Sequence, residues 1–295
     1  MSDIRIAAAQ YPIDYFERFD DFRTKLDRWV IEAVTAGAEL LVFPEYGAME
    51  LASLFPAEVQ RSLPDQLAAM QGLLDDFLAA HRALARKHGV HILASSIPVR
   101  AGDRYYNRAH LFSPAGEVVY QDKCIMTRFE NEQWGISGSD ELKVFDTALG
   151  KIGITICYDV EFPLLAQAMA QAGAELILAP SCTDTEAGYY RVRIGAQARA
   201  LENQCHVVQA VTVGEAAWSE AVDVNVGAAA LYSPVDVGFT ANGIVDIGER
   251  DQPGWVYSTA RLRRARTVRR AGQVFNVRDW PQQLEPARRV RIVEL

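Results

Sequence analysis

Short apolar runs alternate with longer amphipathic stretches along the first two thirds of this 295-residue chain. Short runs rich in Val, Ile and Leu and bounded by turn residues predict strands, because such side chains suit a buried pleated surface. The predicted strands are Ile4–Ala9, Leu40–Phe43, Val90–Ala94, Arg108–Phe112, Glu117–Gln121, Lys151–Ile156, Leu176–Ala179 and His206–Val213. The predicted helices are Phe19–Ala36, Leu63–His88, Pro163–Ala172 and Tyr189–Asn203.

The order of these elements predicts the fold class. Gly37, Gly89 and Gly173 each follow a predicted helix, where a residue free to adopt positive φ ends the helix at little steric cost. Strands and helices interleave, which is typical of an α/β protein. The turn at residues 113–116 adds a hairpin between two strands. With no repeat or flexible linker in the chain, we expect one domain.

The last part of the chain differs in charge from the rest. Between Arg261 and Arg291 arginines far outnumber the acids Asp279 and Glu285, whereas the formal net charge of the whole chain is −8. Runs of one charge usually serve solvation or docking. We therefore expect residues 1–260 to form the main domain and residues 261–295 to form a basic arm, either part of that domain or a dimer contact.

Composition excludes several classes of protein. Apolar residues make up 49% of the chain and charged residues 23%, as in an ordinary soluble globular enzyme. The negative net charge argues against a general nucleic-acid binder. No apolar run is long enough to cross a membrane, and the start of the chain lacks the basic segment and apolar core of a secretory signal. We expect a cytoplasmic protein with neither nucleic acid nor membrane as a partner.

The four cysteines are expected to be free thiols. Cys124, Cys157, Cys182 and Cys205 are far apart in a large chain without an export signal. None has the close spacing of a zinc ligand set. We expect neither a metal nor a cofactor.

The strongest local signal surrounds Cys157. The predicted strand Lys151–Ile156 runs into this cysteine, and Pro163 opens a helix a few residues later. A strand–turn–helix elbow exposes the side chain at its turn at the mouth of the sheet. The nearby helix terminus and any adjacent cation would favour the thiolate, which is the nucleophilic form of cysteine.

Two other predicted strands also end on charged side chains. Glu45 follows Leu40–Phe43, and Lys123 follows Glu117–Gln121. Each residue alone is an ordinary surface charge, but the carboxyl ends of parallel strands share one face of an α/β sheet, and ligands bind there. Acyl transfer at an unactivated C–N bond needs a nucleophile, a base and a donor for the oxyanion. A thiol, a carboxylate and an ammonium meet these needs without any of the five histidines.

Three motifs in one order carry a resemblance to a known family. The segments FPE, YQDK and GITICYDVEFP place Glu45, Lys123 and Cys157 in the order found in the nitrilase superfamily of carbon–nitrogen hydrolases. The similar region extends from IRIAAAQ near the start to GIVDIGE, which ends at Glu249. The resemblance implies a four-layer α-β-β-α sandwich, dimerised through helices, with the C-terminal arm often reaching the partner.

The resemblance also implies roles for individual residues. Glu45 would be the general base, Cys157 would form a thioester, and Lys123 would stabilise the tetrahedral intermediate. The backbone N–H of Tyr158 would be a second oxyanion donor. A further glutamate that orients the substrate and the lysine would be Glu130 by its distance from Lys123, or Glu132 by its distance from the tryptophan at position 134.

One segment departs from the pattern of the better-known small amidases. Residues 180–185 replace the commoner proline-alanine-aromatic segment that borders the pocket in the family. Cys182 in this segment is either a pocket residue or a packed, inert thiol. Substrate preference taken from better-known members is therefore in doubt.

Three functions remain open from the sequence. The leading hypothesis is an amidase-type hydrolase that acts on a small linear amide and forms a homodimer or larger homo-oligomer. The residues Tyr158-Asp159 after the nucleophile favour an amide over a nitrile by resemblance. The alternatives are a nitrilase or amide-forming acyltransferase, and a non-catalytic member that uses the pocket for binding.

Overall fold

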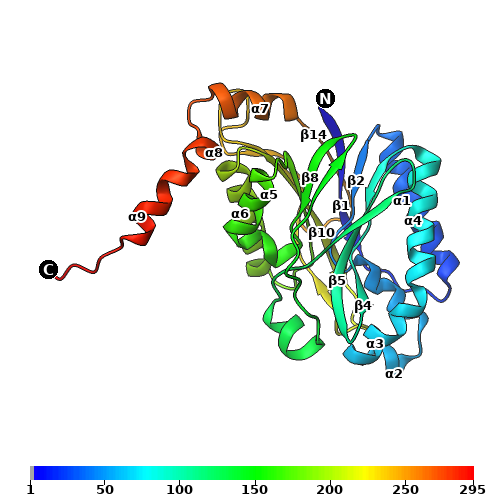
Figure 1. Cartoon of the computed structure of the whole chain (residues 1–295). Coiled ribbons are helices and arrows are strands. Elements are labelled where there is room, and N and C mark those ends of the chain that lie inside the picture. Colours follow the sequence, from blue (N-terminus) through cyan, green and yellow to red (C-terminus); the bar gives the residue numbers. More distant parts are fainter. Residues whose placement is uncertain (1–2) are drawn as a thin grey trace.

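The computed structural model describes residues 3–295, and these fold around a large curled β-sheet (Figure 1). The strands are β1 (Ile4–Pro12), β2 (Leu40–Val42), β3 (His91–Leu93), β4 (Ile97–Ala101), β5 (Arg104–Phe112), β6 (Val118–Asp122), β7 (Val144–Thr147), β8 (Gly150–Ile154), β9 (Leu176–Ser181), β10 (His206–Glu215), β11 (Val224–Asn225), β12 (Ala230–Tyr232), β13 (Ile244–Ile247) and β14 (Gly254–Ala260).

The α-helices lie between β1 and β2, between β2 and β3, between β8 and β9, between β9 and β10, and after β14. They are α1 (Phe19–Thr35), α2 (Ala57–Gln60), α3 (Leu63–Met70), α4 (Leu74–His88), α5 (Pro163–Gln171), α6 (Glu186–Glu202), α7 (Leu262–Ala271), α8 (Asn276–Asp279) and α9 (Leu284–Arg288). Short 3₁₀-helical segments are η1 (Gly47–Leu54), η2 (Gln71–Leu73), η4 (Cys157–Glu161) and η5 (Trp280–Gln283), and η3 (Glu130–Trp134) is one π-helical turn. None of the helices in residues 3–295 is long and apolar enough to cross a membrane.

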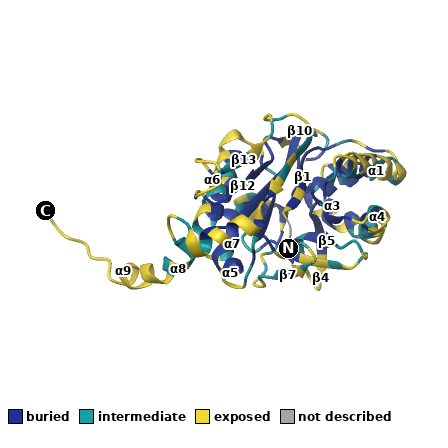
Figure 2. Ribbon diagram, turned by 90° about the horizontal axis from the view of Figure 1, so that it is seen from above, coloured by how far each residue is buried: buried dark blue, intermediate teal, exposed yellow. Residues whose placement is uncertain are grey.

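The order of paired strands across the sheet is β4-β5-β3-β2-β1-β10-β9-β8-β7. Helices α1 and α4 cover one side of this sheet, and α5 and α6 cover the other (Figures 1 and 2). The sheet curls, so that its β1-β2-β5 part and its β8-β9 part share one buried cluster. The result is the expected four-layer α-β-β-α sandwich.

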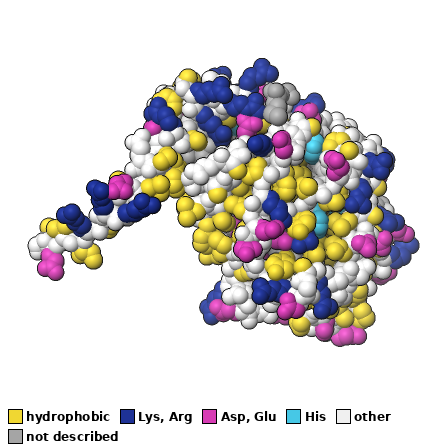
Figure 3. Space-filling view, in the orientation of Figure 1, with side chains coloured by type: hydrophobic (Ala, Val, Ile, Leu, Met, Phe, Trp, Pro, Cys, Tyr) yellow, Lys and Arg dark blue, Asp and Glu magenta, His cyan; other side chains and the backbone are white. Residues whose placement is uncertain are grey.

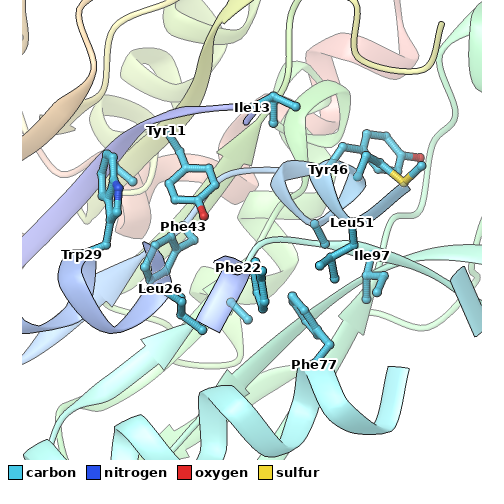
Figure 4. Packing of buried hydrophobic residues seen from close by; sticks show 14 of the residues in the cluster. Tyr11, Ile13, Phe22, Leu26, Trp29, Phe43, Tyr46, Leu51, Phe77 and Ile97 are labelled. Carbon is cyan, nitrogen blue, oxygen red and sulfur yellow. The ribbon is translucent and has the colours of Figure 1, made fainter. Parts of the chain in front are cut away.

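Alternation along β1 shows how one strand serves two layers. Ala7, Ala9 and Tyr11 join the cluster beneath α1 and α4, whereas Ile6 and Ala8 join the cluster between the two parts of the sheet. This follows from the period of two in a strand, which sends successive side chains to opposite faces. Figure 4 shows part of the first cluster, in which aromatic and aliphatic side chains from strands and helices pack together.

Three strands deliver their carboxyl ends to the same edge. Pairing from β2 through β1, β10 and β9 to β8 is parallel at every step. β6 is antiparallel to β5, which is antiparallel to β3, which is parallel to β2. β2, β6 and β8 therefore point the same way, and the residues that follow them meet at one edge.

The predicted elements are present, with two kinds of difference. The helix expected over Leu63–His88 is divided into α3 and α4 by the 3₁₀ turn η2. Strands β4, β7 and β11 to β14 and helices α2 and α7 to α9 were not predicted. β14 pairs with β1 over seven residues, so the end of the sheet-forming region returns to its first strand.

Residues 261–295 begin on the body and end away from it. Helix α7 packs through Leu262, Ala265 and Val268, which are at most 2% exposed. Beyond α8 the chain leaves the body as an extended arm with α9 in it (Figures 1 and 2), and residues 281–295 are all exposed. The basic segment is thus a docked helix followed by a free end.

Candidate active site

Cys157 is the first residue of η4, directly after the strand β8 and its two-residue extension. Its φ of +49° lies in the left-handed region, which is costly for a residue with a side chain. A residue kept in such a conformation is held there by its surroundings, and this strain is common at functional sites. The elbow predicted from the sequence is therefore present, with the thiol at its turn.

Asp159 ties the cysteine turn to the lysine loop. Its carboxylate accepts hydrogen bonds from the backbone N–H groups of Ile156 at 3.3 Å, Cys124 at 3.1 Å and Ile125 at 2.7 Å. Two of these donors lie directly after Lys123, and the third lies directly before Cys157. One buried carboxylate thus fixes the distance between the two segments.

Glu45 lies at the end of β2, on a segment that is anchored on both sides. Tyr46 has a φ of +52°, and its N–H donates to Ser96 Oγ at 2.9 Å. A side chain on Gly47 would place its Cβ 2.4 Å from Ser95 Oγ and 3.1 Å from Ser95 Cβ, so Ser95 would have to shift to admit it. The following helix η1 is held by buried Glu50, which pairs with Lys25 of α1 at 2.6 Å.

Lys123 joins the two carboxylates of the site. Its Nζ lies 2.8 Å from Glu45 Oε1 and 2.6 Å from Glu130 Oε2, and all three side chains are at most 3% exposed. Removing one partner of a buried pair leaves a charge without compensation, at a cost of about 3–5 kcal/mol. The three residues are therefore expected to act as a unit.

The structure distinguishes between the two candidate glutamates. Glu130, in the π-helical turn η3, lies against Lys123 and also accepts from Tyr46 Oη at 2.7 Å and Thr127 Oγ1 at 2.8 Å. Glu132 faces solvent with half of its side chain exposed, and it pairs with Arg128. The turn directs the Glu132 side chain to the surface, so the geometry favours Glu130 over Glu132 as the glutamate that orients the lysine.

The two buried carboxylates have opposite pKa shifts. Burial raises the pKa of Glu45 to about 7, helped by the charge of Glu130 and opposed by Lys123. Burial also acts to raise the pKa of Glu130, but Lys123 and the donors of Thr127 and Tyr46 outweigh it and lower the pKa below its ordinary range. When the surroundings move the pKa values of two acids in opposite directions, the two acids can take different catalytic roles. Glu45 suits a base near neutral pH, and Glu130 suits a permanent anion.

The thiol and the ammonium also differ from free side chains. Burial and the nearby Glu45 raise the pKa of Cys157 well above its ordinary value, despite the opposing charge of Lys123. Burial acts to lower the pKa of Lys123, but Glu130 and Glu45 raise it well above the ordinary value. The expected resting thiolate is therefore wrong, because burial and a neighbouring anion outweigh the cation. A base must take the thiol proton during the reaction.

These residues form the floor of a cavity of about 470 Å³. Its aromatic wall comprises Tyr46, Phe129 and Trp134, and Trp134 packs on Tyr46 with ring centroids 4.6 Å apart. The outer lining carries charges, namely Arg128, Asp184, Arg191, Glu220 and Asp223. Glu45, Lys123, Cys157 and Glu130 all reach this cavity, which therefore unites the residues predicted from separate motifs.

The two remaining predicted residues lie beside the nucleophile in different ways. Cys182 lines the cavity, its N–H donates to Glu45 Oε2 at 2.9 Å, and its carbonyl accepts from Cys157 Sγ at 3.7 Å. The Tyr158 side chain is not in the cavity lining but packs edge-on against Phe162 at 4.8 Å. Its N–H lies in the first turn of η4, where such groups have no partner within the helix.

Several residues of the site were not predicted from the sequence. Asn107 of β5 donates to Glu45 Oε1 at 2.8 Å. The hydroxyls of Tyr46 and Thr127 donate to Glu130, and Asp159 accepts from the backbone beside Lys123 and Cys157. Tyr46 and Asp159 adjoin predicted residues, so their position was a usable signal. Asn107 had none. No group of His, Cys, Asp and Glu within residues 3–295 could hold a metal ion.

Comparison with known proteins agrees with this geometry. The sequence model of the family described as carbon-nitrogen hydrolase matches residues 5–237. The Bacillus subtilis protein named "Probable hydrolase YhcX" is 34% identical over 94% of this chain, and the chain spans only 53% of the length of that relative. An omega-amidase of Homo sapiens is 26% identical over 76% of this chain and 82% of its own.

Solved structures show the same fold. A carbon-nitrogen hydrolase from Helicobacter pylori G27 superposes with a TM-score of 0.78 at 19% identity, covering 98% of this chain and 99% of the other. The family match covers most of the chain, and the layered fold agrees with it. The chain belongs to the carbon-nitrogen hydrolase family.

Proposed function

We propose that the protein is an amidase that cleaves a small linear amide through a thioester on Cys157. The observation that carries the proposal is the buried contact of Lys123 with Glu45 and Glu130 on the floor of the cavity that Cys157 also lines. The likeness to an omega-amidase supports an amide as the substrate.

The first half of the reaction forms the thioester. Glu45 takes the proton of the Cys157 thiol, and the sulfur attacks the amide carbon while the carbonyl electrons move to oxygen. Lys123 and the N–H of Tyr158 stabilise this oxyanion. When the intermediate collapses, the C–N bond breaks and Glu45 returns its proton to the leaving nitrogen.

The second half releases the acid. Water loses a proton to Glu45 and attacks the thioester carbon, and the C–S bond breaks with the proton returning to sulfur. Glu130 keeps its charge throughout and holds Lys123 in place, because its pKa is lowered. In each half of the reaction Glu45 first accepts a proton and then returns it, and a pKa of about 7 suits both transfers near neutral pH.

The proposal favours an amide over a nitrile. In the family that the chain resembles, Tyr-Asp directly after the nucleophile is common in amidases, and this chain has Tyr158-Asp159 at that place. A matched aliphatic amide and nitrile, compared by kcat/KM for ammonia release, test the choice. Faster turnover of the nitrile would reverse it, and turnover of neither would direct attention to acyl transfer.

We further propose a cytoplasmic homodimer that joins through the α5 and α6 layer. Leu164, Tyr190, Ile194 and Leu201 on these helices are 40–64% exposed. Figure 3 shows hydrophobic side chains gathered on the side from which the arm departs. Exposed apolar patches mark interaction sites. The four cysteines are free, which suits a reducing compartment.

The direct test of catalysis compares two single variants with the wild type. Cys157→Ala is expected to lose all turnover while keeping the wild-type fold, and Cys205→Ala, at a buried thiol outside the cavity, is expected to keep most of it. Ammonia release from a panel of short amides measures activity, and circular dichroism checks the fold. Full turnover by a folded Cys157→Ala variant would refute the proposal.

A further inference from the structure

Asn107 is an unusual residue for its place in the fold. Asparagine is depleted in strands, yet Asn107 lies within β5 and is fully buried. Its side-chain Oδ1 has no hydrogen-bond partner within residues 3–295. Leaving a buried acceptor unpaired costs about 1–3 kcal/mol, so a buried asparagine of this kind calls for an explanation.

The amide nitrogen of Asn107 contacts both carboxylates of the site. Nδ2 donates to Glu45 Oε1 at 2.8 Å and approaches Glu130 Oε1 at 3.5 Å. The backbone carbonyl of the same residue accepts from the N–H of Lys123 at 2.9 Å. With the amide turned round, Oδ1 would face two carboxylates, which cannot donate when ionised. Asn107 thus contacts every charged member of the floor.

The hydrogen bonds on Glu45 differ between its two oxygens. Oε1 accepts from Lys123 at 2.8 Å and from Asn107 at 2.8 Å, which occupies both of its lone-pair positions. Oε2 accepts from the N–H of Cys182 at 2.9 Å and has one position left. Cys182 also borders the thiol, because its carbonyl accepts from Cys157 Sγ at 3.7 Å.

We propose that Asn107 is a positioning residue of the catalytic base: its amide saturates Glu45 Oε1, so that the thiol proton is taken by Oε2. The amide also separates Glu45 from Glu130. Without this donor, Glu45 can rotate or be protonated on the wrong oxygen, and its charged form loses a stabilising hydrogen bond. A hydrogen bond to a carboxylate lowers its pKa, so the loss raises the pKa of Glu45.

The inference extends the proposed mechanism, but its first test needs no substrate. Cys157 alkylation by iodoacetamide is followed against pH by peptide mapping in the wild type and in Asn107→Leu, which has a similar volume and no donor. Because ionised Glu45 must take the thiol proton, the pH at which alkylation rises follows the pKa of Glu45. It is expected to move upward by about one unit in the variant, which is the size of a single hydrogen bond to a charge.

A second variant covers the case in which Asn107→Leu does not fold. Asn107→Asp keeps the shape and adds a negative charge, so the same upward shift is expected, and larger. Asn203→Leu is the matched control: Asn203 is also buried, but its amide nitrogen donates to the carbonyl of Arg199 at the end of α6, outside the site. This control is expected to leave the pH dependence of Cys157 unchanged.

Turnover then separates positioning from binding. For an amide that the wild type hydrolyses, Asn107→Leu is expected to lower kcat by about 10–100-fold with little change in KM. Base catalysis contributes about 100–10,000-fold, and the variant keeps the base but loses its positioning. An unchanged alkylation profile in a folded Asn107 variant, or a shift equal to that of Asn203→Leu, would overturn the inference. If the wild type hydrolyses no amide but the alkylation profile shifts, the proposed function fails and the inference stands.

Discussion

Glu45 and Glu130 are chemically identical side chains that the fold separates by their hydrogen bonds. Glu130 accepts from Lys123, Tyr46 and both the N–H and the hydroxyl of Thr127, whereas Glu45 has fewer donors and lies beside the thiol. Glu130, which has more hydrogen-bond donors, stays ionised, whereas Glu45 titrates near neutrality. This division makes Glu45 the base and leaves Glu130 as the anion that fixes Lys123.

The pKa of Glu45 predicts the pH dependence of hydrolysis. Since the base must be deprotonated, kcat/KM is expected to rise with pH through a midpoint near the Glu45 pKa of about 7. The Lys123 pKa is raised well above its ordinary value, so loss of its charge does not limit the rate there. Initial rates between about pH 5 and 9 measure this.

Glu132→Gln serves as the control for this profile, because Glu132 is exposed and outside the cavity. Its profile is expected to match the wild type. A wild-type rate that falls as the pH rises through neutrality would contradict the assignment of Glu45 as base, because protonation would then be activating.

At the scale of elements, the site depends on turns tied to one another. Asp159 joins the turn at Cys157 to the loop after Lys123, and Lys25 joins α1 to η1 behind Glu45. The strands bring the three turns to one edge, and these ties set their spacing. A base displaced by even about 1 Å loses much of its effect.

Asp159→Asn tests the tie between the cysteine and lysine segments. The amide nitrogen would face backbone donors, so we expect a loss of about 1–3 kcal/mol in the free energy of unfolding and a lower kcat. Urea denaturation and ammonia release measure the two. Asp146→Asn, at an exposed position on β7, is the control and is expected to change neither. Wild-type stability in Asp159→Asn would show that the tie is not needed.

The strands that carry the reacting residues were predictable because their signals are local. Each of β2, β6 and β8 is a short segment containing Val, Ile or Leu that leads to a charged or thiol side chain. Asn107 and the partners of Asp159 were not, since their contacts join residues far apart in sequence. β14 is mostly half-exposed, and its pairing with β1 is a tertiary contact.

At the scale of the whole molecule, the arm contains two structurally distinct parts. Arg269 of α7 donates to the carbonyls of Gln204 and Asn203, each at 3.0 Å, and therefore closes the end of α6. Past α8, Val290, Ile292 and Val293 are 78–98% exposed. The first part belongs to the fold of the monomer, and the second is free to contact another copy.

Two truncations separate these parts. Removal from Val268 onward is expected to lower the melting temperature, because it deletes a buried valine and the bonds of Arg269. Removal from Leu284 onward is expected to keep the melting temperature of the monomer but shift the dimer toward monomer by mass action. Light scattering coupled to size exclusion measures the assembly. An unchanged assembly after the shorter truncation would show that the free end makes no subunit contact.

The central claim is that Cys157 carries the acyl group during turnover, and intact-mass and peptide mass spectrometry after acid quenching test it most directly. Glu45→Gln, which lacks the base for hydrolysis, is mixed with an activated ester of a short acid, whose leaving group departs without a proton. The mixing is done at an alkaline pH, where part of the Cys157 thiol ionises without the base. An added acyl mass on the peptide containing Cys157, absent from Cys157→Ala and from the peptides of Cys124, Cys182 and Cys205, is the expected result. Acylation of another cysteine, with Cys157 unmodified, would contradict the claim.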